Sequence, residues 1–235
     1  MHELELMKYL KQYRDCLTLS FTLDEEMVED IKLDDAFSIN IKMGKGGVVA
    51  SNERSLLFSV YRILKAIGFE WLYPGKEGEF IPDLSSFDFS SFSLVTTEVA
   101  SNRVRGYCME GGFSVEQLID TIDFLPKQFF NTYFFQFLTP FNFLNDYYLH
   151  KGNNLFKPCH ITEEFAVEVK KEAIREIQKR HLLIHDMGHG WTGRCFGIES
   201  RGWINITKDE QSLVDNSLLA QLNGKREIYA ATMSC

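Results

Sequence analysis

The segment RSLLFSVYRILKAIGFEWLYPGKEGEFIP (54–82) carries the clearest structural pattern in the first half of the chain. Ser51 or Asn52 can cap a helix that begins at Glu53, because their side-chain oxygens accept the free backbone N–H groups of the first turn. Gly68 is expected to end this helix, since glycine adopts a positive φ without steric cost. The apolar residues between them recur at helical spacing: Leu56, Leu57, Val60, Tyr61, Leu64 and Ile67.

The residues on either side of this helix complete a small α+β domain, which we predict over residues 1–100. Upstream, apolar residues at helical spacing predict a helix over 4–13, and alternating residues predict strands over 17–23 and 37–43. GKGG (44–47) then turns into VVAS (48–51), which indicates a hairpin. Downstream, residues 83–102 are rich in serine and lack a helical period, so we expect a strand or a linker and place the domain boundary there.

After residue 102 the pattern changes to strands that alternate with helices. Such alternation is typical of an α/β fold with a parallel sheet and helical crossovers. The expected strands and helices, in chain order, are 103–109, 114–125, 131–138, 162–180, 181–186 and 207–224.

The opening stretch resembles the accessory domain that precedes the barrel in alpha-glucuronidases and beta-N-acetylhexosaminidases, and in related bacterial proteins. Their pattern is R-x6-Y-x-x-L on a helix, then Gly, an aromatic-rich turn and P-G-x-x-G-x-x-I-P. The resemblance implies an accessory α+β domain followed by a TIM-type (β/α) barrel over 103–235, and an activity on hexosaminides or glucuronides. The matching residues are Arg54, Tyr61, Leu64, Gly68, Trp71, Pro74, Gly75, Gly78, Ile81 and Pro82.

The resemblance also singles out residues of the second half as candidates for substrate binding. Arg105, with Gly106, matches a pair that closes the first barrel strand in such enzymes, and its alternative is a solvated loop charge. Asp186-Met187-Gly188-His189 resembles the D-x-P-G-H turn of the hexosaminidases, although it is one residue shorter and lacks the proline.

Loops at the carboxyl ends of barrel strands carry the active site. There, Asp186 and His189 can hydrogen-bond sugar hydroxyls, and Trp191 can stack on a pyranose ring. The alternative is that Trp191 packs on the barrel rim while His189 bonds to the backbone. The aromatic loop 139–156 is expected to be a lid or a binding surface, with Tyr147, Tyr148 and His150 as its exposed members.

A metal hydrolase built on His185, His189 and Cys195 is a competing hypothesis. Two histidines four residues apart reach one metal from one face of a helix. Here an apolar strand leads into the segment and glycines flank His189, so the helix is not expected and no metal or other cofactor is predicted.

The second half is too short for a complete barrel of about 200 to 250 residues. Glycoside hydrolysis normally needs two carboxyl groups, one of them a general acid, and in the families named the acid lies on or after the fourth strand. We therefore expect the first half of a (β/α)8-type barrel that lacks this acid, with Glu110 as a loop carboxylate. A non-catalytic carbohydrate-binding or interaction protein is the alternative. The open edge of such a half-barrel predicts a homo-oligomer.

Composition and charge limit the remaining classes of partner. The net charge of −8 and the absence of basic runs argue against nucleic acid. Five cysteines without a C-x-x-C pair are typical of a reduced interior. The charged amphipathic start is unlike a signal peptide, and no apolar run is long enough to cross a membrane, so a cytoplasmic location without membrane contact is predicted.

Overall fold

The computed structural model describes residues 2–189, 195–198, 207–215, 217, 221–222 and 225–226. The chain folds into two compact units. The first unit consists of residues 1–107, 116–133 and 174–183. The second consists of residues 108–115, 134–173 and 184–235. A domain boundary near residue 102 stays a prediction.

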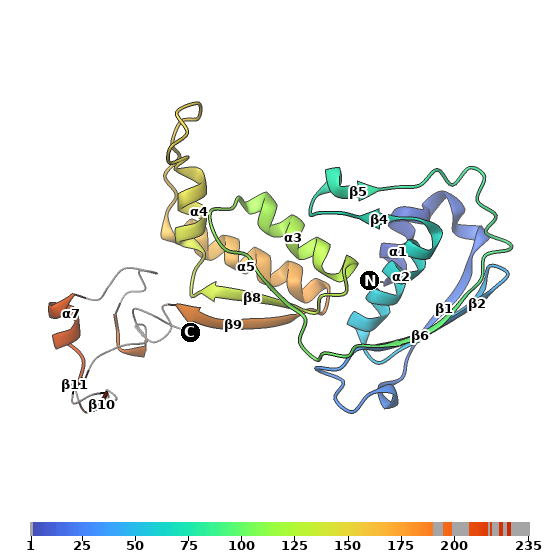
Figure 1. Ribbon diagram of the computed structural model, residues 1–235, viewed down its shortest axis with the longest axis horizontal. Coiled ribbons are helices and arrows are strands. Elements are labelled where there is room, and N and C mark those ends of the chain that lie inside the picture. Colours follow the sequence, from blue (N-terminus) through green and yellow to red (C-terminus); the bar gives the residue numbers. More distant parts are fainter. Residues whose placement is uncertain are drawn as a thin grey trace. The chain divides into compact units, whose positions relative to one another are not determined.

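A four-stranded sheet forms the base of the first unit (Figure 1). Its order is β1-β3-β2-β6; β1 and β3 are parallel, and β2 is antiparallel to β3 and to β6. The predicted hairpin is confirmed as β2 and β3, and its last pair, Lys42 and Lys45, leaves a two-residue turn. The serine-rich segment supplies β6, so that part of it is a strand. The strands are β1 (Thr18–Leu23), β2 (Ala36–Lys42), β3 (Lys45–Ala50) and β6 (Leu94–Val99).

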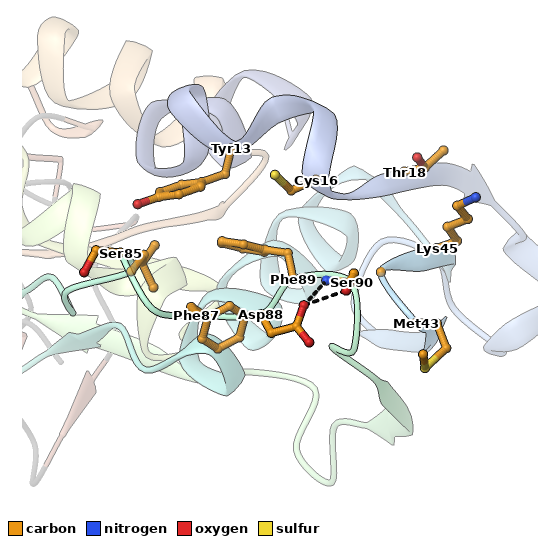
Figure 2. A pocket seen from close by; sticks show the side chains of 12 residues that line it. Tyr13, Cys16, Thr18, Met43, Lys45, Ser85, Phe87, Asp88, Phe89 and Ser90 are labelled. Atoms are coloured by element: carbon orange, nitrogen blue, oxygen red, sulfur yellow. Dashed lines mark hydrogen bonds between the residues drawn. The ribbon is translucent and has the colours of Figure 1, made fainter.

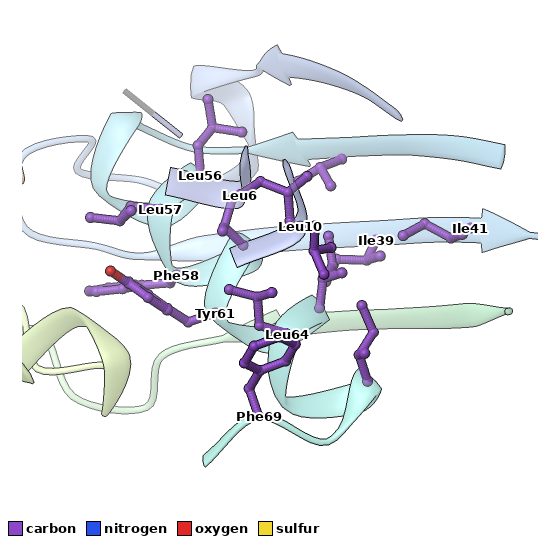
Figure 3. Close-up of a cluster of buried hydrophobic side chains, with 14 of the residues drawn as sticks. Leu6, Leu10, Ile39, Ile41, Leu56, Leu57, Phe58, Tyr61, Leu64 and Phe69 are labelled. Atoms are coloured by element: carbon purple, nitrogen blue, oxygen red, sulfur yellow. The ribbon is translucent and has the colours of Figure 1, made fainter. Parts of the chain in front are cut away.

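Helix α2 (Glu53–Ile67) has the predicted start and end. The Asn52 side chain accepts a hydrogen bond from the backbone N–H of Ser55 at 2.8 Å, and Gly68 ends the helix with φ of 115°. Strands β2 and β3 and helix α1 (His2–Leu10) all pack against α2, so its buried surface is wider than one apolar stripe. A 3-10 helix, η1 (Lys11–Cys16), follows α1. Figure 3 shows the resulting core, with Phe58, Tyr61 and Phe69 among its largest side chains.

Short elements and a buried ionic network complete the first unit. Glu79 accepts hydrogen bonds from the Tyr9 hydroxyl at 2.8 Å and from the Lys127 ammonium at 2.9 Å. Lys127 also donates to Asp123 at 2.6 Å, and Arg180 donates to Asp123 at 2.5 Å. The network joins segments that are distant in sequence. The short elements are η2 (Glu25–Met27), β4 (Glu70–Trp71), η3 (Lys76–Gly78) and β5 (Glu79–Phe80), and β4 pairs with β5.

A second sheet has the order β7-β8-β9, with helices between its strands. At the start of β8 and β9, Leu183 N donates to Asn131 O at 2.7 Å. Near their ends, a Cβ on Gly188 would lie 2.2 Å from Gln136 O. Both strands therefore run in the same direction, as predicted from the helical crossover. The elements are β7 (Gly106–Cys108), α3 (Val115–Lys127), β8 (Thr132–Phe137), α5 (Glu163–Lys179) and β9 (Leu183–His189).

Strand β9 is longer than predicted, which corrects the placement of Asp186 and His189 in a loop. Both residues belong to the strand. The proline of the hexosaminidase turn is absent here, so the backbone N–H groups needed for strand pairing remain. Gly188 has φ of 135° and lies against the neighbouring strand, where a side chain would collide with its backbone.

Three further predictions of local structure are wrong. Strand β7 begins at Gly106, so Arg105 precedes its strand instead of closing it. The first part of the predicted loop 139–156 is helix α4 (Phe141–Tyr148). Of the helix predicted over 207–224, the described residues contain α7 (Lys208–Ser212), and near the end of that range they form strand β10 (Gln221–Leu222), which pairs with β11 (Lys225–Arg226).

After α7 the sequence favours turns rather than a longer helix. Asp215 accepts a hydrogen bond from the backbone N–H of Ser217 at 2.8 Å, and such local bonds compete with helix formation. The residues between the paired strands are Asn-Gly, the strongest short hairpin signal. Of the described helices, none is long and apolar enough to cross a membrane.

Candidate functional site

Arg105 belongs to a buried polar cluster around Asp35, whose side chain is 3% exposed. The Asp35 carboxylate accepts hydrogen bonds from Arg54 Nε at 2.8 Å, Arg105 Nη2 at 2.5 Å and Asn131 Nδ2 at 2.9 Å. Burial alone would raise the pKa of the Asp35 carboxyl, but the Arg54 and Arg105 guanidinium groups hold this pKa below its usual value. We call these four residues the Asp35 cluster.

Other donors of Arg105 are also satisfied within the first unit. Its Nε donates to Phe129 O and its Nη1 to Asn102 O, both at 2.7 Å. The guanidinium carbon lies 5.7 Å from the centre of the Phe58 ring. These contacts fix the segment that leads into β7, and they give Arg105 a structural task at the start of its strand. A substrate-binding role for Arg105 stays a prediction.

Asp186 forms an ion pair with Lys170 of α5 in the second unit. Lys170 Nζ donates to Asp186 Oδ1 and to Leu138 O, each at 2.8 Å. The ammonium also lies 4.8 Å from the centre of the Phe135 ring. The side chain of Lys170 is 10% exposed and that of Asp186 is 28% exposed, so the carboxylate remains within reach of solvent.

Lys170 could have been found in the sequence. The buried residues Ala166, Val169, Ala173 and Ile177 mark the apolar stripe of α5, and Lys170 falls inside that stripe at helical spacing. A lysine on the buried face of a helix needs an anionic or carbonyl partner. Its partner Asp186 was a candidate, but the sequence does not indicate that the two residues meet.

The neighbouring residues of β8 and β9 present a second polar and aromatic surface. The rings of Phe134 and His185 meet edge to face with centres 5.0 Å apart, and His185 is exposed. Two residues on from Phe134, the buried amide oxygen of Gln136 has no hydrogen-bond partner among the described residues. Buried polar groups are nearly always paired. A ligand or a water molecule could donate a hydrogen bond to this Gln136 oxygen.

Tyr147 belongs to a run of neighbouring rings on α4 and the segments after it. Adjacent ring centres are 5.2 Å apart for Tyr147 and Tyr148, 6.0 Å for Tyr147 and His150, and 5.2 Å for His150 and Phe156. Phe165 of α5 continues the run, 6.5 Å from Tyr148. Tyr147 is 38% exposed and Phe156 is 58% exposed, so the run forms an aromatic surface of the second unit. We call these five residues the aromatic run.

The remaining candidates are His189, Trp191, Cys195 and Glu110, and two of them lie partly or wholly outside the described residues. His189 is the last residue of β9, and its side chain lies outside them, as does all of Trp191. Cys195 is exposed and free, and Glu110 is exposed. Within the described residues, no group of three His, Cys, Asp or Glu side chains could hold a metal ion. The structure thus brings Asp186 to Lys170 and Tyr147 to other rings.

Seven described carboxyl groups have a pKa below the ordinary value, whereas a general acid needs a raised pKa. They are Asp35, Glu79, Asp83, Asp88, Asp123, Glu164 and Glu176.

Comparison with known proteins supports the fold. No family model matches the sequence, and no curated protein matches it. A solved structure, a family 89 glycoside hydrolase from Clostridium perfringens in complex with PUGNAc, is similar to 90% of this chain with a TM-score of 0.50 and 10% sequence identity. The similarity covers 26% of that chain, so the present chain spans about a quarter of its length.

Proposed function

We propose that this chain binds carbohydrate as part of a glycoside hydrolase-like protein, with an accessory α+β domain and the first strands of a (β/α) barrel. The fold it shares with a glycoside hydrolase supports this architecture. The resemblance of residues 54–82 favours hexosaminides or glucuronides as ligands. The parallel strands β8 and β9, joined by α5, have the connection that a barrel requires.

The observation that carries the proposal is the exposed aromatic run. Pyranose rings present flat patches of C–H groups, and aromatic rings supply large and rigid contact area at low entropic cost. Tyr147 and Phe156 offer such rings to solvent, and the Tyr148 hydroxyl accepts a hydrogen bond from Val115 N at 3.3 Å, which holds α4 in place. Asp186 and His189 of β9, and Trp191 two residues later in the sequence, are proposed as further contacts to the sugar.

We propose that this chain binds the sugar without hydrolysing it. Hydrolysis needs a carboxyl group with a raised pKa and a second carboxylate beside the bond. Asp186 is paired with Lys170, and Glu110 is an exposed loop carboxylate. A paired carboxylate and an exposed one can both accept hydrogen bonds from sugar hydroxyls.

Calorimetric titration with oligosaccharides of N-acetylglucosamine and of glucuronic acid tests the proposal. Tyr147→Ala should weaken binding about tenfold, the equivalent of ~1.4 kcal/mol. Tyr73→Ala is the matched control, because Tyr73 is a similarly exposed tyrosine of the first unit, with 52% of its surface exposed. Unchanged affinity in Tyr147→Ala, or no binding by the natural chain to either sugar, would refute the proposal.

A further inference from the structure

A pocket of about 480 Å³ lies in the first unit, and none of the proposed sugar contacts Tyr147, Phe156, Asp186, His189 and Trp191 is among its lining residues. Three segments line this open pocket: η1 with the start of β1, the β2–β3 turn, and the loop 84–90. Figure 2 shows Tyr13 and Cys16 on one side of it and Phe87 and Asp88 on the opposite side. Its volume is in the range of small-molecule sites, about 300 to 1,000 Å³.

The walls of the cavity are held together by backbone contacts. Thr18 N donates to Gly44 O at 3.0 Å, and Gly44 N donates to Phe92 O at 2.9 Å. Gly44 has φ of 72°, and a Cβ there would lie 2.6 Å from Phe89 O. The turn therefore lies directly against the loop, and only glycine allows this approach. The cavity is a built feature of the α+β fold.

One wall of the cavity is aromatic. The rings of Tyr13 and Phe89 stack at 4.9 Å with 30° between their planes, and Phe87 meets Phe89 edge to face at 4.7 Å. Phe89 is buried, whereas Tyr13 and Phe87 are half-buried and keep part of their surface toward the cavity. Packing against Phe89 fixes the other two rings, so their surfaces are organised before any ligand arrives.

The remaining lining is polar and carries both signs of charge. Asp88 Oδ1 accepts hydrogen bonds from Ser90 N at 3.0 Å and Ser90 Oγ at 2.6 Å. A carboxylate has about four lone-pair sites, so Asp88 can also accept from a ligand. Lys45 contributes an ammonium donor, and Thr18 contributes a hydroxyl that both donates and accepts.

We propose that this cavity is a second saccharide site, which takes one or two uncharged pyranose rings; the inference rests on the proposed function. The aromatic wall suits the C–H face of a sugar, while the carboxylate, ammonium and hydroxyl groups suit its hydroxyls. A phosphate or nucleotide is disfavoured, because the lining carries the negative charge of Asp88 beside the positive charge of Lys45, and Asp88 would repel an anion. An acyl chain is disfavoured because it would leave these charged groups without partners.

Cys16 supplies a direct readout, since this exposed and free thiol lines the cavity. The full chain is treated with iodoacetamide, and alkylation of each cysteine is followed by peptide mass spectrometry in the presence of tri-N-acetylchitotriose or cellotriose. Cys159, also exposed and free, is the internal control. Alkylation of Cys16 should slow about tenfold at a sugar concentration ten times the midpoint, and that of Cys159 should not change.

Matched variants test the lining. Asp88→Asn should raise the midpoint of protection several-fold, because an amide has fewer acceptor sites than a carboxylate. Asp24→Asn is the control, since Asp24 Oδ1 likewise accepts from the backbone N–H two residues on, at 3.1 Å, but lies outside the lining. Tyr13→Ala should abolish protection of Cys16. Tyr13→Phe keeps the aromatic ring and should therefore retain most of the protection.

The two proposals fail in different ways. Protection of Cys16 that persists in Tyr147→Ala supports a separate site in the first unit. Sugar binding that disappears in Tyr147→Ala while Cys16 is never protected overturns this inference and leaves the proposed function standing. Protection that Asp88→Asn and Tyr13→Ala leave unchanged also overturns it.

Discussion

Asp35→Asn barely changes the shape of the side chain, yet it should lower the free energy of unfolding by a large amount. The side chain of Asp35 is 3% exposed and that of Arg54 is 5% exposed, and Arg54 Nη2 lies 2.7 Å from Asp35 Oδ1. An asparagine keeps the volume but removes the charge, and its NH2 group would face the donors of Arg105 and Asn131. Arg54 would remain buried without a counter-charge.

The expected cost is large. Removing one partner of a buried ion pair typically costs about 3–5 kcal/mol, whereas a typical domain has a free energy of unfolding of about 5–15 kcal/mol. Asp34→Asn is the matched control next door: its partner Arg103 is 52% exposed, so that pair should contribute less than about 1 kcal/mol. The difference between the two variants isolates the effect of burial.

Urea unfolding followed by far-UV circular dichroism measures both variants against the natural chain. Asp35→Asn should shift the midpoint to much lower urea, and Asp34→Asn should leave it nearly unchanged. Adding Arg54→Met to Asp35→Asn should recover part of the loss, because the uncompensated cation is then removed. If the two variants lose free energies of unfolding that differ by less than about 1 kcal/mol, burial does not strengthen the Asp35 pair as argued.

Three other outcomes follow from the same structure. Burial would raise the pKa of Asp123, but Lys127 and Arg180 lower this pKa to about 2, below the unfolded value of about 3.9. The ionised carboxylate therefore contributes its full stability above about pH 4, and this contribution is lost as the pH falls toward 2. Asp123→Asn should flatten the pH dependence of Tm in this window. The chain should hydrolyse aryl glycosides no faster than buffer, and turnover abolished by Glu110→Gln would show the opposite. Sedimentation at micromolar concentration should show a homodimer or larger assembly, since an open sheet edge pairs with another chain; a monomer of 27.2 kDa would contradict this.

Local periodicity and capping were readable in the sequence because they involve residues close together in the chain. Helix α2 begins after Asn52 and ends at Gly68, as the cap residues predict, and the β2–β3 hairpin lies where the alternation changes. Helix α5 follows its apolar stripe in the same way. Strand β9 exceeded its predicted end because pairing with a neighbour, and not its own residues, decides where a strand stops.

The sites, by contrast, depended on contacts between distant residues. Asp35 meets Asn131, 96 residues away, and Lys170 meets Asp186, 16 residues away, through the path of the chain between them. Local residue patterns were enough to predict α2, the β2–β3 hairpin and α5, and the apolar stripes of the two helices. That Asp35 holds Arg105 just before its strand could not be predicted, because an ion pair has no local signature and exists only where the topology brings its partners together.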